Sequence, residues 1–364
     1  MSLAARVSGA VVACTCMHAL SAAPAAAEER CLDYADGKRI GALDDKRMQE
    51  VSGLAASELQ PGILWAHNDS GASTWLYAID EGGELVARFE VDGADAVDWE
   101  DVALGPCGAP DGLRDCLFVA DTGNNVGDRE DQAIYRVVEP DVGDASELTE
   151  PADVMGIVLP EGVDVEALFL DAQGALWLVS KRDTKALLFT VGRFEADATI
   201  EAELVAERKD IEFVTGADAT ADGTRIVLRS ARRAWEIFRP KGRAMRSAFL
   251  GEALEIELDK EPQGEAVALE PDGSGFYTTS EGRGAPIRWY RCKRFGATLT
   301  GKEDAGGLVA DPPEVDAGAG CAGGGAGGAA ALGVALALAL ARGRRRRKTG
   351  MSSRRSPAIS SLGP

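Results

Sequence analysis

The sequence predicts an all-β protein, a β-propeller for which five blades is the favoured count and six the alternative. Two observations carry this prediction. Between Cys31 and Arg294, short runs rich in Val, Leu, Ile, Phe, Trp and Tyr alternate with Gly, Asp and Asn, with little helical periodicity. These runs also recur, four to a unit of roughly 50 residues, as in propeller blades. A β-sandwich is the other all-β alternative.

The units follow one another along the chain in a constant order. Their expected strands are 50–57, 63–69, 75–80 and 84–91, then 99–106, 116–125, 133–140 and 153–160, then 165–171, 175–182, 186–193 and 200–207, then 215–223, 225–230, 234–240 and 247–258, and finally 264–273, 275–282 and 286–292. The last unit lacks a fourth strand, while segment 32–43 belongs to no unit. We therefore expect an N-terminal strand to close the ring and to cover the open sheet edge.

Four of the seven cysteines lie in this body, which we place at residues 31–296. Cys107 and Cys116 flank a turn-rich octet, which favours a loop disulfide. Ring closure would bring Cys31 next to Cys292, so we expect these two to pair. An even number of cysteines suits an oxidising compartment.

Charge is unevenly distributed. Of 39 basic and 59 acidic residues, one basic residue lies in 1–27 and eight lie in 342–364, neither of which holds an acid. Residues 28–341 therefore carry 30 basic and 59 acidic residues, a net charge of −29 against −20 for the whole chain. Such a body lacks the basic clusters that displace counterions from phosphates, so nucleic acid is excluded as a partner.

The N-terminus has the features of a secretory signal peptide over residues 1–27. Arg6 precedes an apolar run at 7–20, and the alanines at 25–27 fit a cleavage site. The alternatives are a buried N-terminal helix and a lipoprotein signal that is cleaved before Cys14.

A linker rich in Gly, Ala, Asp and Pro is expected at 297–328, an apolar membrane segment at 329–341 and a basic cytoplasmic tail at 342–364. Counted from Cys321, 21 uncharged residues precede the arginines, enough to cross a bilayer of about 30 Å. Cys321, the apolar span and the Arg cluster resemble the MYXO-CTERM sorting tag of myxobacterial surface proteins, although the tail after the arginines is longer. The resemblance implies export and anchoring at the cell surface or outer membrane; a plain single-span anchor would place the body outside too.

In a propeller the innermost strand of each blade lines a central channel, and the second strand runs antiparallel to it. The start of the first strand and the end of the second therefore lie at the same mouth of the channel, and polar residues are concentrated at both places. Carboxylates that converge there need a cation, a basic partner or protonation. Oxygen donors without a cysteine thiolate or a histidine cluster suit Ca²⁺, or else Mg²⁺. The expected metal ligands are Glu50, Asp69, Glu100, Asp121, Asn124, Glu166 and Glu265. A structural role for the glutamates, bonding to backbone N–H groups of adjacent blades, is the alternative.

Other residues near this mouth suit a ligand. Lys181, Arg182 and Arg229 could neutralise the carboxylates or bind an anionic group, and Trp99 could stack on a ring. Asn125 completes the expected ligand-binding set. His67 and Glu100 are the candidates for acid/base catalysis, while the alternative for His67 is a hydrogen bond to a neighbouring loop.

The motifs at residues 50–55, 65–71, 98–101 and 121–125 resemble those of a propeller superfamily with gluconolactonase/regucalcin-like and phytase- or esterase-like members. The resemblance implies a divalent metal held by inner-strand Glu and channel Asn or Asp. We expect a surface-anchored, monomeric propeller that binds a cation and an unidentified small-molecule or surface ligand. The alternative is a metal-dependent hydrolase of a phosphoester, ester or lactone.

Overall fold

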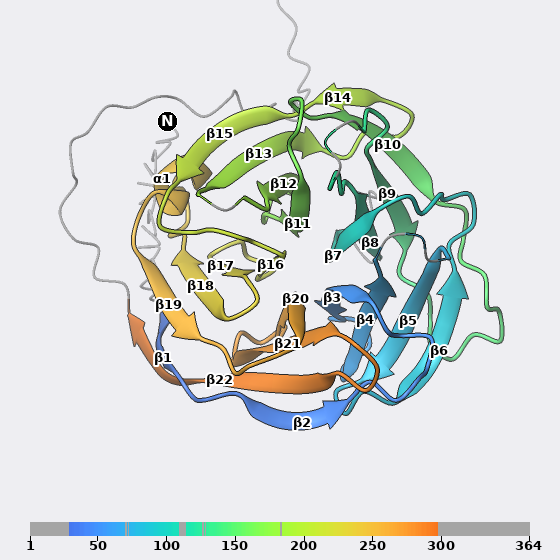
Figure 1. Cartoon of the computed structure of the whole chain (residues 1–364), viewed down its shortest axis with the longest axis horizontal. Coiled ribbons are helices and arrows are strands. Elements are labelled where there is room, and N and C mark those ends of the chain that lie inside the picture. Colours follow the sequence, from blue (N-terminus) through green and yellow to red (C-terminus); the bar gives the residue numbers. More distant parts are fainter. Residues whose placement is uncertain are drawn as a thin grey trace, which may run out of the picture. The chain divides into compact units, whose positions relative to one another are not determined.

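The computed structural model describes residues 29–297, apart from 70, 72, 109–113, 126, 128 and 183. Five sheets surround a central channel, so the prediction of a five-bladed β-propeller is confirmed (Figure 1). The expected signal peptide, nearly all of the linker, Cys321, the apolar segment and the basic tail lie outside the described residues. Within the described part, no helix is long and apolar enough to cross a membrane.

Each blade is an antiparallel meander whose first strand lines the channel. The innermost strands are β3 (Val51–Ala56), β7 (Trp99–Pro106), β11 (Val165–Leu170), β16 (Gly216–Ala219) and β20 (Gln263–Leu269). The second strands are β4 (Ile63–Asn68), β8 (Asp115–Asp121), β12 (Ala175–Ser180), β17 (Arg225–Arg229) and β21 (Gly275–Glu281). The third are β5 (Trp75–Asp80), β9 (Ala133–Val138), β13 (Ala186–Arg193), β18 (Arg233–Phe238) and β22 (Pro286–Ala297). The fourth are β6 (Leu85–Glu90), β10 (Asp153–Val158), β15 (Glu203–Arg208) and β19 (Ala253–Glu257).

Two N-terminal strands complete the last blade, as expected. Both β1 (Glu29–Tyr34) and β2 (Lys38–Ala42) pair with the long strand β22. A disulfide joins Cys31 to Cys292 across this closure, and a second joins Cys107 to Cys116, so both predicted pairs are confirmed. Tyr34 also donates a hydrogen bond to Glu236 of the fourth blade and accepts one from Arg225. The ring is therefore closed by a backbone ladder, a disulfide and a buried polar cluster.

Two segments differ from the strands predicted for them. The segment 247–258 was expected to be one strand, but α1 (Met245–Phe249) occupies its start because Met245, Ala248 and Phe249 fill the space between the third and fourth blades. The segment 200–207 is divided between β15 and β14 (Thr199–Glu201), and β14 pairs in parallel with β10 of the second blade.

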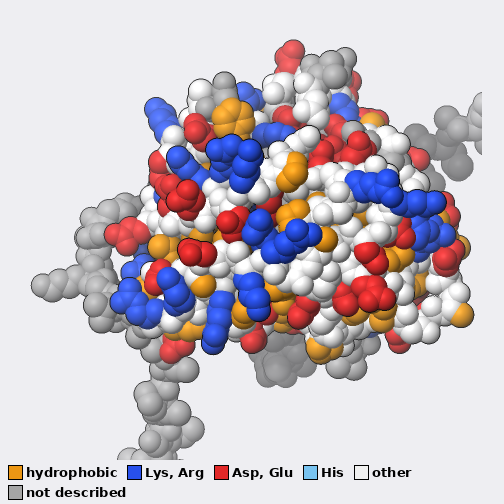
Figure 2. Space-filling view, turned by 60° about the horizontal axis from the view of Figure 1, so that its bottom comes forward, with side chains coloured by type: hydrophobic (Ala, Val, Ile, Leu, Met, Phe, Trp, Pro, Cys, Tyr) orange, Lys and Arg blue, Asp and Glu red, His pale blue; other side chains and the backbone are white. Residues whose placement is uncertain are grey.

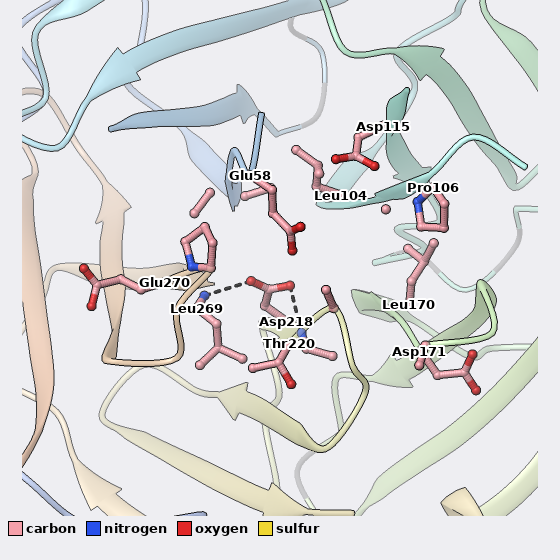
Figure 3. A pocket seen from close by; sticks show the side chains of 17 residues that line it. Glu58, Leu104, Pro106, Asp115, Leu170, Asp171, Asp218, Thr220, Leu269 and Glu270 are labelled. Carbon is pink, nitrogen blue, oxygen red and sulfur yellow. Dashed lines mark hydrogen bonds between the residues drawn. The ribbon is translucent and has the colours of Figure 1, made fainter. Parts of the chain in front are cut away.

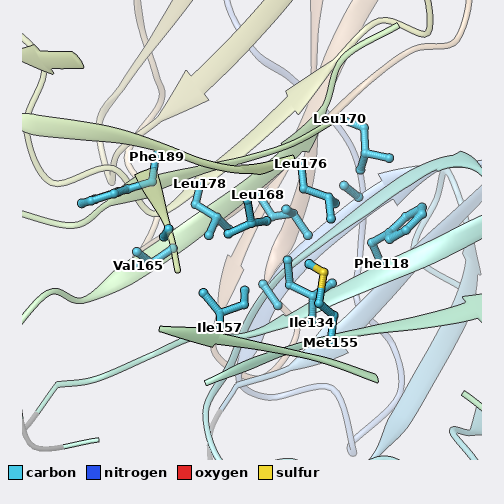
Figure 4. Packing of buried hydrophobic residues seen from close by; sticks show 14 of the residues in the cluster. Phe118, Ile134, Met155, Ile157, Val165, Leu168, Leu170, Leu176, Leu178 and Phe189 are labelled. Carbon is cyan, nitrogen blue, oxygen red and sulfur yellow. The ribbon is translucent and has the colours of Figure 1, made fainter. Parts of the chain in front are cut away.

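The core lies between neighbouring sheets. Five hydrophobic clusters fill the five spaces between blades. In Figure 4, Phe118, Ile134 and Met155 of the second blade face Leu168 and Leu176 of the third. Because each sheet is covered on both faces, its strands read as apolar runs with little alternation. On the face shown in Figure 2, basic and acidic side chains are interspersed.

Candidate cation site at one mouth of the channel

The inner strands of four blades carry a β-bulge close to their first residue. The bulged residues are Ser52, Glu100, Glu166 and Glu265, each of which interrupts the pairing with the second strand. A bulge leaves its residue outside the ladder and re-aims the side chain. The fourth blade has Gly216 at this position, paired without a bulge. The sequence predicts Glu50 as a metal ligand beside the other glutamates, but it does not share their position. Glu50 is exposed and lies two residues before Ser52, which holds the matching place.

Five carboxylates from the first three blades meet at this mouth in two groups that share Glu100. Asp69, Asp98 and Glu100 form one group, and Glu100, Asp164 and Glu166 form the other. In each group the candidate ligand oxygens lie within 4.8 Å of one another. A divalent ion about 2.3–2.6 Å from each oxygen would fit such spacing.

Sequence reasoning included Asp69, Glu100 and Glu166 among the ligands but left out Asp98 and Asp164. The sequence does contain a pattern that would have predicted Asp98 and Asp164. Asp98-Trp99-Glu100 and Asp164-Val165-Glu166 repeat the same Asp-x-Glu pattern at the start of two inner strands. The residue before each bulge, Trp99 or Val165, packs in the core between two neighbouring blades, whereas the two acidic residues that flank it reach the same mouth.

Glu100 has the least compensated carboxylate of the two groups. Its side chain belongs to a residue only 2% exposed, and Oε1 has no hydrogen-bond partner among the described residues. Burial, followed by the charges of Glu166, Asp69, Asp98 and Asp164, raises the pKa of Glu100 well above its ordinary value. An ionised carboxylate here therefore lacks the compensation that a buried charge normally has.

Lys181 lies beside the second group. Its Nζ is 2.7 Å from Glu166 Oε1 and 2.6 Å from Oε2. Burial raises the pKa of Glu166 to about 9 even though the ammonium of Lys181 lowers it. Burial lowers the pKa of Lys181, but Glu166 and then Glu265 and Glu100 raise it more, so the side chain is a cation at neutral pH.

The loop after β8 holds both Asp-x-Glu segments in place. Asp121 accepts hydrogen bonds from the N–H of Asp98 and of Val97, and also pairs with Arg129 at 2.7 Å. Asn124 donates its N–H to Asp164 Oδ1 at 2.7 Å, while its side-chain oxygen accepts from Gly127 and Arg129. The predicted ligand Asp121 thus supports the site and lies outside both carboxylate groups, and the side-chain oxygen of Asn124 is engaged by its own loop.

Three predicted ligand or catalytic roles do not fit the burial of their residues. Trp99 is 1% exposed and packs against His67 and Tyr135, so it is no stacking surface at the mouth. His67 is 0% exposed, and burial lowers its pKa to about 4. Arg229 is 0% exposed and is paired with Glu261 at 3.0 Å, which withdraws it from any anionic ligand.

The remaining predicted residues lie at or near the same mouth. Glu265 is the bulge residue of the fifth blade, and burial raises its pKa, but it belongs to neither group. Arg182 donates to the carbonyl oxygen of Gly162, and Asn125 is exposed. Asp101 of β7 is 0% exposed and accepts hydrogen bonds from the backbone of Leu168 and Ala217, so it links the inner strands of three blades.

The opposite mouth holds a pocket of about 220 Å³, bounded by the far ends of the inner strands (Figure 3). Glu58, Asp115 and Asp218 line it together with Leu104 and Leu170. Asp218 accepts hydrogen bonds from the N–H of Ala219 and of Leu269, and burial raises its pKa to about 7. None of the residues predicted from the sequence to bind or catalyse lines this pocket.

No protein-family model matches the chain, and no curated protein matches it. Among solved structures, it is similar to the soluble aldose sugar dehydrogenase of Escherichia coli in its apo form. The identity is 11%, 71% of this chain and 99% of that chain are covered, and the TM-score is 0.41. A chain of a nidogen/laminin complex is 14% identical over 64% of this chain and 73% of that chain, with a TM-score of 0.38. Neither similarity bears on activity.

Proposed function

We propose that the protein is a cation-dependent ligand-binding propeller whose channel mouth holds a divalent cation between Asp69, Asp98 and Glu100. The observation that carries the proposal is the buried Glu100 carboxylate, whose Oε1 lacks a hydrogen-bond partner among the described residues and lies with two further carboxylates. A buried charge with charged neighbours of the same sign is stable only with a counter-ion or a proton.

Ca²⁺ suits this group better than Mg²⁺. The donors are carboxylate oxygens from the end of β4 and the start of β7, an arrangement that tolerates the irregular geometry of Ca²⁺ more readily than the strict octahedron of Mg²⁺. Ca²⁺ takes six to eight oxygens, so three residues leave positions for water or for oxygens of a ligand. Asp69 and Asp98 are partly exposed, which places those open positions toward solvent.

The alternative, a metal-dependent hydrolase, has less support. A hydrolase of this kind needs a base beside the metal, and His67 is buried with a pKa of about 4. Glu100 is then both a candidate ligand and the remaining candidate base. The family resemblance to gluconolactonase/regucalcin-like and phytase- or esterase-like propellers rests on the same mouth residues and stays part of this proposal.

The test is a thermal melt of the purified protein after chelation, with and without added Ca²⁺. A free Ca²⁺ concentration one hundred times the Kd would add about 2.7 kcal/mol to the free energy of unfolding. Glu100→Gln should abolish this increase, whereas Glu50→Gln, at the same mouth but outside both groups, should retain it. No increase in the wild-type protein would refute the cation site. Turnover of an ester, lactone or phosphoester that Ca²⁺ stimulates and Glu100→Gln abolishes would favour the hydrolase.

We also propose that the protein is exported and anchored at the cell surface by its C-terminal segment. Two disulfides in the body support an oxidising compartment. Removal of residues 316–364 should shift the protein from the membrane fraction to the medium, and Cys321→Ser should do so if the tag is processed at that residue. A membrane fraction unchanged by the truncation would contradict anchoring.

A further inference from the structure

We propose that Glu100, Asp164 and Glu166 form a second divalent-cation position, and that an ion there exchanges with the ammonium group of Lys181. This inference rests on the proposed function, because it assigns a second, regulated ion to the same mouth. It concerns a different set of side chains from the first position, with only Glu100 in common.

The geometry favours exchange over joint occupancy. Lys181 Nζ lies within 2.7 Å of both oxygens of Glu166, so the ammonium occupies the space in front of this carboxylate. Two cations a few ångströms apart repel one another strongly where water is scarce. An ion that binds Glu166 must therefore displace Lys181. The lysine side chain is 32% exposed, so solvent offers it an alternative position.

The charges show why the position also suits an ion of higher charge. Glu100 and Glu166 are each 2% exposed, and Asp164 lies beside them. One ammonium balances only one of these three carboxylates. Asp164 is held by the N–H of Asn124 through Oδ1, which leaves its other oxygen available to an ion.

Glu100 links the two positions. Its carboxylate belongs to both groups, and its Oε1 has no hydrogen-bond partner among the described residues. A carboxylate can give one oxygen to each of two ions. Occupancy of the first position would then hold Glu100 oriented for the second, but the charges of the two ions oppose each other, so the second ion should be the weaker.

The experiment titrates chelator-treated, full-length protein with Ca²⁺, following stoichiometry by native mass spectrometry and affinity by calorimetry. We expect two ions on the wild-type protein, the second weaker. Asp164→Asn should remove only the second ion. Asp98→Asn should remove the first ion and leave the second one. Glu100→Gln should remove both, while Glu50→Gln serves as the control for loss of a carboxylate at the same mouth.

Lys181→Met is the decisive variant for the exchange, because it removes the competing ammonium group and leaves all the carboxylates in place. It should tighten the second ion about tenfold while leaving the first within about twofold. Lys181→Gln is the replacement if the Met variant does not fold. A single ion on the wild-type protein, or an unchanged second affinity in both Lys181 variants, would overturn the exchange while leaving the first site intact. If the wild-type protein binds no ion, the proposed function fails as well.

Discussion

Lys181 Nζ lies 2.6 Å from Glu166 Oε2 at the channel mouth, and Lys185 Nζ lies at the same distance from Glu207 Oε2 on the outside of the same blade. The two ion pairs differ in burial. Glu166 has a side chain 2% exposed, whereas that of Glu207 is 44% exposed. The two lysines are similarly exposed, at 32% and 31%, so the burial of the carboxylate makes the difference: water screens the outer pair more than the inner one.

Loss of Lys181 should accordingly be costly only when no cation is present. In chelator, Lys181→Met should lower the free energy of unfolding by about 1–3 kcal/mol, because it leaves the buried Glu166 carboxyl without its hydrogen-bond donor. Lys185→Met should lower it by less than about 1 kcal/mol. Denaturant unfolding with and without Ca²⁺ measures both. Equal losses in the two variants, or no recovery of Lys181→Met with Ca²⁺, would contradict the assignment.

Stability should fall as the pH rises from 6.5 to 9 in chelator. Burial raises the pKa of Asp218 and of Glu281 to about 7 and that of Glu166 to about 9. A carboxyl with a raised folded-state pKa binds a proton on folding, and its contribution is lost between the unfolded-state pKa of about 4 and the folded-state value. That loss is nearly complete by about pH 7 for Asp218 and Glu281, so the decline above pH 7 belongs to Glu166. His67, with its lowered pKa, opposes this only below about pH 6.5, where its unfolded form becomes charged.

Denaturant unfolding across this pH range tests the sign. Saturating Ca²⁺ should remove the part of the decline that belongs to Glu166, because a bound ion favours the ionised carboxyl. The part that belongs to Asp218, at the other mouth, ends near pH 7; it should persist with Ca²⁺ and disappear in Asp218→Asn. Stability that rises over the same range would show that these carboxyls are ionised without a cation.

Gly123→Ala should damage the cation site with little effect on the fold. A methyl group at this position would overlap Glu100 Oε1 and Asp98 Oδ2, which are the ends of flexible side chains. We expect Ca²⁺ affinity to fall at least tenfold and the melting temperature in chelator to change little. Gly143→Ala, in an exposed turn where a methyl group would approach only Asp141, is the control. An unchanged Ca²⁺ affinity in Gly123→Ala would place the ion elsewhere.

The two disulfides should differ in their contribution to stability. Cys31–Cys292 spans 261 residues and joins β1 to β22, whereas Cys107–Cys116 spans 9. A longer loop loses more entropy when it is closed in the unfolded chain. Replacing both cysteines of the long pair by Ser should cost about 2–5 kcal/mol in denaturant unfolding, and replacing those of the short pair less. The reverse order would indicate that the ladder of β1 with β22 closes the ring without help.

The strand runs, their recurrence and the unassigned segment 32–43 were sufficient to predict five blades and the closing strand. These features are local, because a strand buried on both faces must be apolar along its length and a turn needs Gly, Asp or Asn. The pairing of Cys31 with Cys292 followed from two observations: these two cysteines remain once Cys107 and Cys116 are paired, and ring closure brings them together. The sequence also contains the pattern Asp98-Trp99-Glu100, repeated as Asp164-Val165-Glu166, which is enough to predict Asp98 and Asp164 as ligands.

The direction in which each mouth residue points was decided by tertiary structure. A shift of one residue in register moves a side chain to the other face of a sheet, and the bulges at Glu100 and Glu166 make such shifts without a signature in composition. The bulge at Glu100 sends Trp99 into the core. Burial of Arg229 against Glu261 depends on contact with the next blade, 32 residues along the chain. Sequence patterns report periodicity within a strand, and neither register against a partner nor distance between blades is contained in them.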